Sequence, residues 1–113
     1  MIEEILYNFL GDYLSAPVYT EIPKSYPSRF YTIEKTGSAR DNHINSSTVA
    51  LKSYSSDSLY DAAEMNEELK EVMLYNLIES PEIIRVELNS DYNFTDSATK
   101  QYRYQAVFDI KHY

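Results

Sequence analysis

The chain lacks cysteine and tryptophan altogether, and it has only two glycines among its 113 residues. Without cysteine it cannot form disulfide bonds, thiolate metal sites or a cysteine nucleophile. With glycine only at Gly11 and Gly37, it has neither a glycine-rich phosphate loop nor the glycine-flanked serine turn of a hydrolase. Packing and hydrogen bonding alone must therefore stabilise the fold.

Basic residues are also scarce. Ten Lys and Arg stand against eighteen Asp and Glu, so the net charge is −8. This balance repels phosphate backbones and lacks the basic stripe that sequence-independent binding of nucleic acid requires. We therefore do not expect the chain to bind duplex DNA.

Long apolar runs are missing as well. No stretch approaches the roughly 20 apolar residues of a membrane span, and the segment from Met1 to Leu6 does not look like an export signal. We expect an intracellular product without membrane contact, with residues 1–113 forming one domain.

Tyrosine, in contrast, is abundant, with twelve residues in the chain. Tyrosine suits both the half-buried face of a β-sheet and the surface where two proteins meet. We expect most of these side chains to pack within a sheet, and the remainder to contact other proteins.

Hydrophobic periodicity and proline positions predict an α+β domain. The expected elements are a helix over 2–14, strands over 18–22, 29–36 and 47–54, a second helix between Ser56 and Pro81, and strands over 83–88 and 101–111. The order is α-β-β-β-α-β-β, with a mixed, mostly antiparallel sheet and both helices on one face. Prolines on both sides place the 18–22 strand at an edge of the sheet.

The last strand alternates strongly, and two polar segments accompany it as predicted loops, 37–46 and 91–94. The loop over 37–46 is longer than a compact hairpin needs, so we expect it to be mobile or bound to something outside the domain. Alternation divides the last strand into two faces. Its inner face has Tyr102, Tyr104, Ala106, Phe108 and Ile110, and its outer face has Gln101, Arg103, Gln105, Asp109 and Lys111.

The second helix has an acidic face opposite its apolar one, formed by Glu64, Glu67, Glu68 and Glu71. No histidine lies one turn from these carboxylates, so we predict a solvated face and no metal site. The two histidines, His43 and His112, have no spaced partners. We predict no catalytic residue, no metal and no cofactor.

The order of these pieces resembles the tail terminator, or tail completion, proteins of long-tailed bacteriophages, over almost the whole chain. The segments that carry the resemblance are 17–19, 22–23, 27 with 30–37, 48–51, 59–64, 91–94 and 103–106. Two segments depart from the family pattern. Gly37-Ser38 replaces a typical Gly-Gly, and Thr95-Asp96-Ser97 replaces prolines in the last loop.

The resemblance implies a structural virion protein and not an enzyme. Such proteins form a ring, commonly sixfold, that caps the tail tube, ends its growth and offers a surface to the head-tail connector, while DNA passes through without specific binding. It also implies assembly in the host cytoplasm and a place at the head-proximal end of the tail. Candidate interface residues are Gly37, Arg40, His43, Asp91, Tyr92, Asn93, Phe94, Arg103 and Gln105.

Two expectations concern charge. Because the guanidinium of arginine suits interface ion pairs, we expect Arg103 to pair with an acidic group across a subunit boundary. The acidic helix face lines the ring's opening or faces solvent.

Alternatives from other classes stay open at this point. One is a head-to-tail connector or stopper ring. Another is a small acidic ligand-binding or enzymatic domain with a pocket between the second helix and the sheet, near Tyr104 or His112. A third, an RNA-binding sheet, lacks basic residues among its aromatics.

Overall fold

The fold is α+β with the predicted order of elements. The structure, a computed structural model, describes residues 1–96, 98–99 and 101–113. The elements are α1 (Ile2–Tyr13), β1 (Val18–Tyr19), β2 (Arg29–Asp41), β3 (Ile44–Ser55), α2 (Leu59–Glu71), β4 (Ile83–Asn93) and β5 (Tyr102–His112). Two short helical turns, η1 (Val72–Asn76) and η2 (Leu77–Glu79), extend α2 toward β4.

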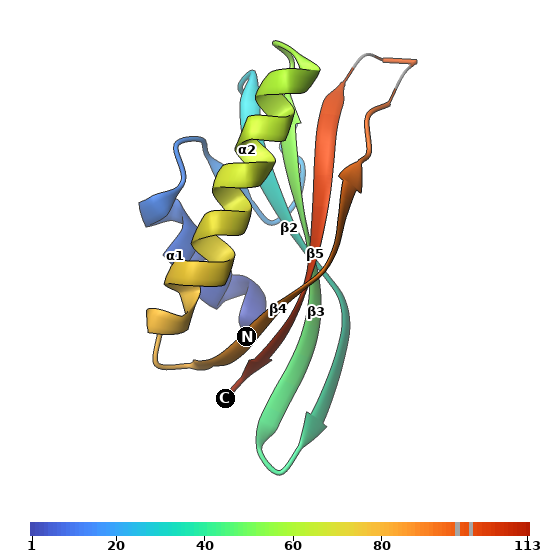
Figure 1. The fold of residues 1–113 in the computed structure, drawn as a ribbon. Helices are drawn as coiled ribbons and strands as arrows, with labels where there is room; N and C mark the ends of the chain where they lie inside the picture. Colours follow the sequence, from blue (N-terminus) through green and yellow to red (C-terminus); the bar gives the residue numbers. More distant parts are fainter. Residues whose placement is uncertain (97, 100) are drawn as a thin grey trace.

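The strands form one mixed sheet in the order β1-β2-β3-β5-β4. β1 runs parallel to β2, and the other neighbours are antiparallel. Both helices cover the same face of this sheet (Figure 1), which we call the inner face. The predicted fold class and the edge position of β1 are confirmed.

The core lies between the helices and the inner face. α1 contributes Ile2, Leu6 and Leu10, and alternation along β5 contributes Ala106, Phe108 and Ile110. The apolar stripe of α2 continues through its two extra turns. Its buried members include Met65, Leu69, Val72, Met73 and Leu77.

In the described part of the chain no helix covers the opposite, outer face of the sheet, but aromatic side chains cover one end of it. Phe30 stacks on Tyr54 with ring centroids 4.5 Å apart, while Tyr19 and Tyr26 pack against Phe30. Four tyrosine and phenylalanine rings thus bury part of this face, as the composition suggested.

The predicted loop over 37–46 is wrong, because these residues extend β2 and β3 into one long hairpin. Asp41 pairs with Ile44, so only Asn42 and His43 form the turn, and both have positive φ. These are the angles of a tight hairpin turn whose twist matches that of the strands. The hairpin extends beyond the helices (Figure 1), and we call residues 37–46 the hairpin arm.

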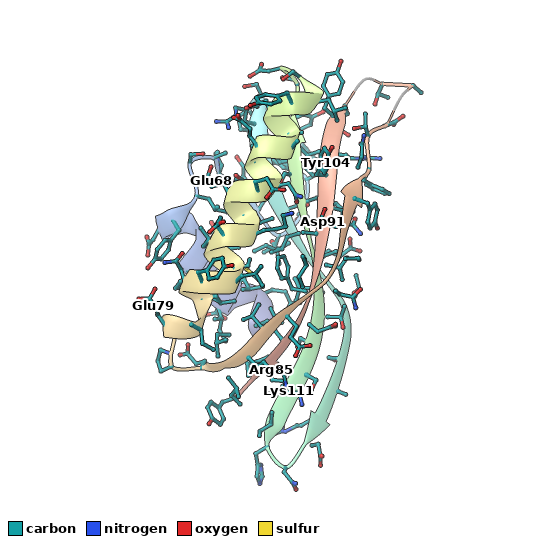
Figure 2. The ribbon with its side chains drawn as sticks, viewed as in Figure 1. Glu68, Glu79, Arg85, Asp91, Tyr104 and Lys111 are labelled. Atoms are coloured by element: carbon teal, nitrogen blue, oxygen red, sulfur yellow. The ribbon has the colours of Figure 1, made fainter. Side chains whose placement is uncertain are left out.

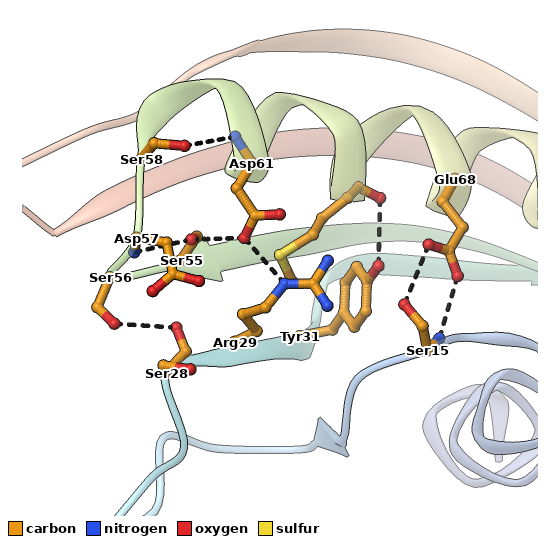
Figure 3. Close-up of polar contacts among 11 residues, drawn as sticks. Ser15, Ser28, Arg29, Tyr31, Ser55, Ser56, Asp57, Ser58, Asp61 and Glu68 are labelled. Atoms are coloured by element: carbon orange, nitrogen blue, oxygen red, sulfur yellow. Dashed lines mark hydrogen bonds and ion pairs between the residues drawn. The ribbon is translucent and has the colours of Figure 1, made fainter.

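Polar contacts join the start of α2 to the sheet (Figure 3). The cap of α2 is Ser58, whose side chain accepts a hydrogen bond from the Asp61 amide, two residues after Ser56, where the helix was expected to begin. The Asp61 carboxylate accepts hydrogen bonds from Ser55 Oγ at 2.7 Å and from Arg29 Nε at 2.8 Å. These contacts orient the first turn of the helix across β2 and β3.

The titration of Asp61 reflects this environment. Partial burial by itself raises the pKa of the Asp61 carboxyl, but the hydrogen bonds from Ser55 and Arg29 outweigh burial and hold the pKa below its usual value. A second polar contact between the sheet and α2 comes from Tyr31, whose hydroxyl donates a hydrogen bond to the Met65 carbonyl at 3.3 Å. Burial raises the pKa of the Tyr31 phenol far above its usual value, so this donor keeps its proton.

Replacement of Leu69 by alanine tests the core. Leu69 is 0% exposed, and the cavity left behind should cost about 2–5 kcal/mol of unfolding free energy. Urea unfolding measures the loss. The matched control is Leu59→Ala on the same helix, where the side chain is 38% exposed and the expected loss is below about 1 kcal/mol. Equal losses at both sites would contradict the packing described.

Replacement of Asp61 by asparagine tests the polar contact through its dependence on pH. At pH 7 we expect a loss of about 1 kcal/mol, because the site is partly exposed and charged hydrogen bonds are lost. When the pKa of a carboxyl is lower in the folded state than in the unfolded state, its charge stabilises the folded state at pH values above the unfolded pKa. This stabilisation is lost as the pH falls through the folded pKa. The difference from wild type should therefore shrink below about pH 4.

Urea unfolding at several pH values measures this difference. Glu21→Gln, in the exposed segment after β1, is the control and should leave stability unchanged at every pH. If the difference in unfolding free energy between Asp61→Asn and wild type stayed constant down to pH 2, the charge of the Asp61 carboxylate would not contribute to stability.

Candidate protein-interaction site

A polar site with several side-chain contacts lies on the outer face of the sheet, where β4 ends and β5 begins. We call its members, Tyr92, Phe94, Arg103 and Gln105, the Arg103 cluster. The Arg103 guanidinium lies 4.5 Å from the centre of the Phe94 ring, and its Nε donates to the Phe94 carbonyl at 2.6 Å. Gln105 donates to the Tyr92 hydroxyl at 2.6 Å. The strand pairing of Tyr92 with Gln105 brings these side chains together.

These contacts fix the orientation of Arg103 before any partner arrives. Its Nη1 donates to Gln101 Oε1 at 3.1 Å, and the ring of Phe94 stacks beneath it. Among the residues that the structure describes, no carboxylate forms an ion pair with Arg103. Lys52 also approaches the Phe94 ring, at 5.4 Å, while its Nζ pairs with Glu34 at 3.3 Å. The site therefore presents an oriented guanidinium, whose planar fork has the geometry to receive a carboxylate.

The predicted loop over 91–94 is corrected, because Asp91, Tyr92 and Asn93 belong to β4. Alternation therefore separates their side chains. Tyr92 faces outward with Gln105, whereas the Asp91 carboxylate lies 3.0 Å from Nζ of Lys70 on α2. Asp91 thus joins β4 to the helix, and it is not a neighbour of Arg103 on the same face.

The hairpin arm brings together the other predicted interface residues. Gly37 lies at a bulge in β2, Arg40 lies in the strand, and His43 lies in the turn. All three are exposed. At the base of the arm, a shallow outer-face groove of about 470 Å³ is lined by both basic and acidic side chains, among them Arg85, Glu87, Asp109 and Lys111. Arg85 and Lys111 lie next to each other beside the arm (Figure 2).

The acidic face of α2 is less uniform than predicted. Glu64 and Glu71 are exposed, and Glu67 pairs with Lys70 at 2.8 Å. For Glu68 the predicted solvated position is wrong. Its carboxylate accepts hydrogen bonds from the amide and the hydroxyl of Ser15, at 3.0 and 3.2 Å (Figure 3). Glu68 therefore fixes the segment between α1 and β1, and it is unavailable as a free surface charge.

Sequence reasoning missed the partner of His112. Ser47 Oγ lies 2.8 Å from His112 Nε2, and both side chains are buried on the inner face. Nδ1 of His112 faces the Tyr113 carbonyl at 3.2 Å. With the proton on Nδ1, the ring donates to this carbonyl and accepts from Ser47. The strand register places the two residues on one face, but nothing in the sequence spacing indicates the pair. Tyr104, the other residue of the pocket alternative, lies opposite Ser53 and Asn93 (Figure 2).

Across residues 1–96, 98–99 and 101–113, no group of three or more His, Asp or Glu side chains is arranged to bind a metal ion. None of the helices described there is long and apolar enough to cross a membrane.

Comparison with known proteins was also negative: no protein-family model and no curated protein sequence matches this chain.

Proposed function

We propose that the chain is a structural subunit of a bacteriophage tail, similar to a tail terminator, that assembles into a ring and acts through its surfaces without catalysis. The sequence resemblance suggests this role, and the element order α-β-β-β-α-β-β agrees with it. The observation that supports it most is the Arg103 cluster. An arginine oriented by Phe94 and Gln101, on a chain of charge −8, is suited to receive a carboxylate from another subunit.

A closed ring requires two different complementary patches on each subunit. The Arg103 cluster and the exposed hairpin arm are two different candidate patches, at well-separated places on the molecule, and each would contact a different complementary surface of a neighbouring subunit. The negative charge suits the passage of DNA, because an acidic opening repels phosphate and does not retain the duplex. On this proposal the exposed carboxylates of Glu64 and Glu71 face either the opening or solvent.

The partners proposed are other copies of this chain, the tail tube protein and the head-tail connector. A connector or stopper ring is the alternative within the virion. Association with tail tubes that lack heads supports the terminator, whereas association with filled heads that lack tails supports the connector.

Replacement of Arg103 by alanine tests the proposed contact. Loss of a charged pair at a subunit boundary should weaken self-association by about ten- to a hundredfold, equivalent to about 1.4–2.8 kcal/mol. Sedimentation velocity across a concentration series measures the change. Arg103→Lys should fall between wild type and Arg103→Ala, because lysine keeps the charge without the planar fork.

Thermal unfolding provides the control for folding, since Arg103→Ala also removes the contact with Phe94. If both variants fold normally and associate as wild type does, Arg103 has no role at a subunit boundary.

A further inference from the structure

The sheet of this chain has two open edges within its described part. β1 pairs only with Tyr31 and Thr32, so β2 has no neighbouring strand on that side along the hairpin arm. At the other edge, β4 is the outermost strand over its whole length of 11 residues. Long unpaired edges offer backbone donors and acceptors to an additional strand.

The phase of the strand pairing shows which residues direct their backbone groups to these edges. The Tyr31 amide donates to the Pro17 carbonyl, so Tyr31 faces the β1 side. Alternate residues along an antiparallel strand face the same side. Counting through the bulge between Lys35 and Gly37, the outward-facing residues of the free part of β2 are Lys35, Ser38 and Arg40.

The same reasoning applies to β4. The Phe94 amide donates to the Arg103 carbonyl, so Phe94 faces β5. Counting back through the bulge between Leu88 and Ser90, the outward-facing residues include Asn93, Asp91, Leu88 and Val86. Asp91, Leu88 and Val86 are the ones that can lie opposite the three outward-facing residues of β2.

We propose that β4 of one copy of this chain pairs with β2 of the next copy, so that one sheet continues into its neighbour. In the order β2-β3-β5-β4 every pair is antiparallel, so β2 and β4 run in opposite directions. A second copy in the same orientation therefore presents β2 antiparallel to β4. The contact joins two different edges, and it can repeat head to tail.

Charge selects a register for this pairing. When Ser38 lies opposite Leu88 of the neighbour, Lys35 lies opposite Asp91 and Asp41 lies opposite Arg85. Asp91, which already contacts Lys70, and Arg85, which already pairs with Glu87, then each gain a second partner of opposite charge. The bulges of the two strands then fall at adjacent steps of the ladder.

The competing pairing of two β2 edges is disfavoured. Centred on Ser38 and counted by outward-facing residues through the bulge, it places Lys35 opposite Arg40 of the other copy, and like charges repel at such positions. In that register the basic residues of the arm oppose pairing with themselves, whereas Lys35 is attracted to the edge that contains Asp91.

This inference rests on the proposed function in one respect, because it states which surfaces join neighbouring subunits of the ring. The pairing itself is a property of the two edges, so the two ideas fail separately. A closed ring joined elsewhere refutes the edge pairing alone. Edge pairing that produces open fibres refutes the ring alone.

Cysteine cross-linking between two variants tests the pairing, and the absence of native cysteine makes it clean. In the proposed register Ala39 lies opposite Glu87, at a non-hydrogen-bonded position where Cβ atoms approach closely enough for a disulfide. Ala39→Cys and Glu87→Cys chains are mixed and oxidised. We expect a cross-linked heterodimer, at least tenfold above the yield from either variant alone.

The controls exclude other contacts. Ala39→Cys alone reports pairing of two β2 edges, and Glu87→Cys alone reports pairing of two β4 edges. Glu21→Cys, in the exposed segment after β1, replaces Glu87→Cys as a matched partner and should not cross-link with Ala39→Cys. A mixture that yields no more heterodimer than this control overturns the proposal, whatever the oligomeric state.

Charge exchange tests the register. Asp41→Arg in the Ala39→Cys chain, or Arg85→Asp in the Glu87→Cys chain, should each slow cross-linking about threefold. The two changes together should restore the rate. Slowing without restoration overturns the register, and unchanged rates in all combinations overturn the charge pairing.

Discussion

The two-residue turn at Asn42 and His43 is the constraint on which the rest of this structure depends. Both residues have positive φ, which costs Asn and His less than most side chains, and the turn fixes Asp41 opposite Ile44. A shift of one residue would move every side chain of β3 to the other face of the sheet. The turn thus decides which residues of β3 enter the core, and it aligns β3 with β5 on its other side.

The length of this hairpin also separates the molecule into two parts. Near α1 and α2 the sheet is covered and packed, with Tyr31, Asp61 and Glu68 as polar ties between layers. The hairpin arm extends beyond both helices (Figure 1), and in the described part of the chain no strand pairs with the free edge of β2 there. Because the helix-covered part contains the hydrophobic core, the hairpin arm can remain exposed and contact other proteins. The Arg103 cluster, at the far end of the sheet from the arm, offers a second surface of different chemistry.

Much of the fold could be predicted from the sequence, because the periodicity of apolar residues and the positions of proline are local patterns that indicate helices, strands and their buried faces. The alternation of β5 and the apolar stripe of the second helix predicted their buried faces. The hairpin arm could not be predicted, since Asn42-His43 lacks the glycine that usually marks such turns, and its polar residues resemble a loop. The contacts of Glu68 with Ser15 and of His112 with Ser47 join segments distant in sequence, and periodicity within one element gives no information about them. The interface role of Arg103 stays a prediction.

Electron microscopy of the purified wild-type chain, from dilute to concentrated solution, tests most directly whether these surfaces build an assembly. We predict closed rings of uniform size with a central opening, because two different patches on each subunit close head to tail. Compact particles with no opening at every concentration, such as a twofold dimer whose subunits use the same patch, would contradict the account.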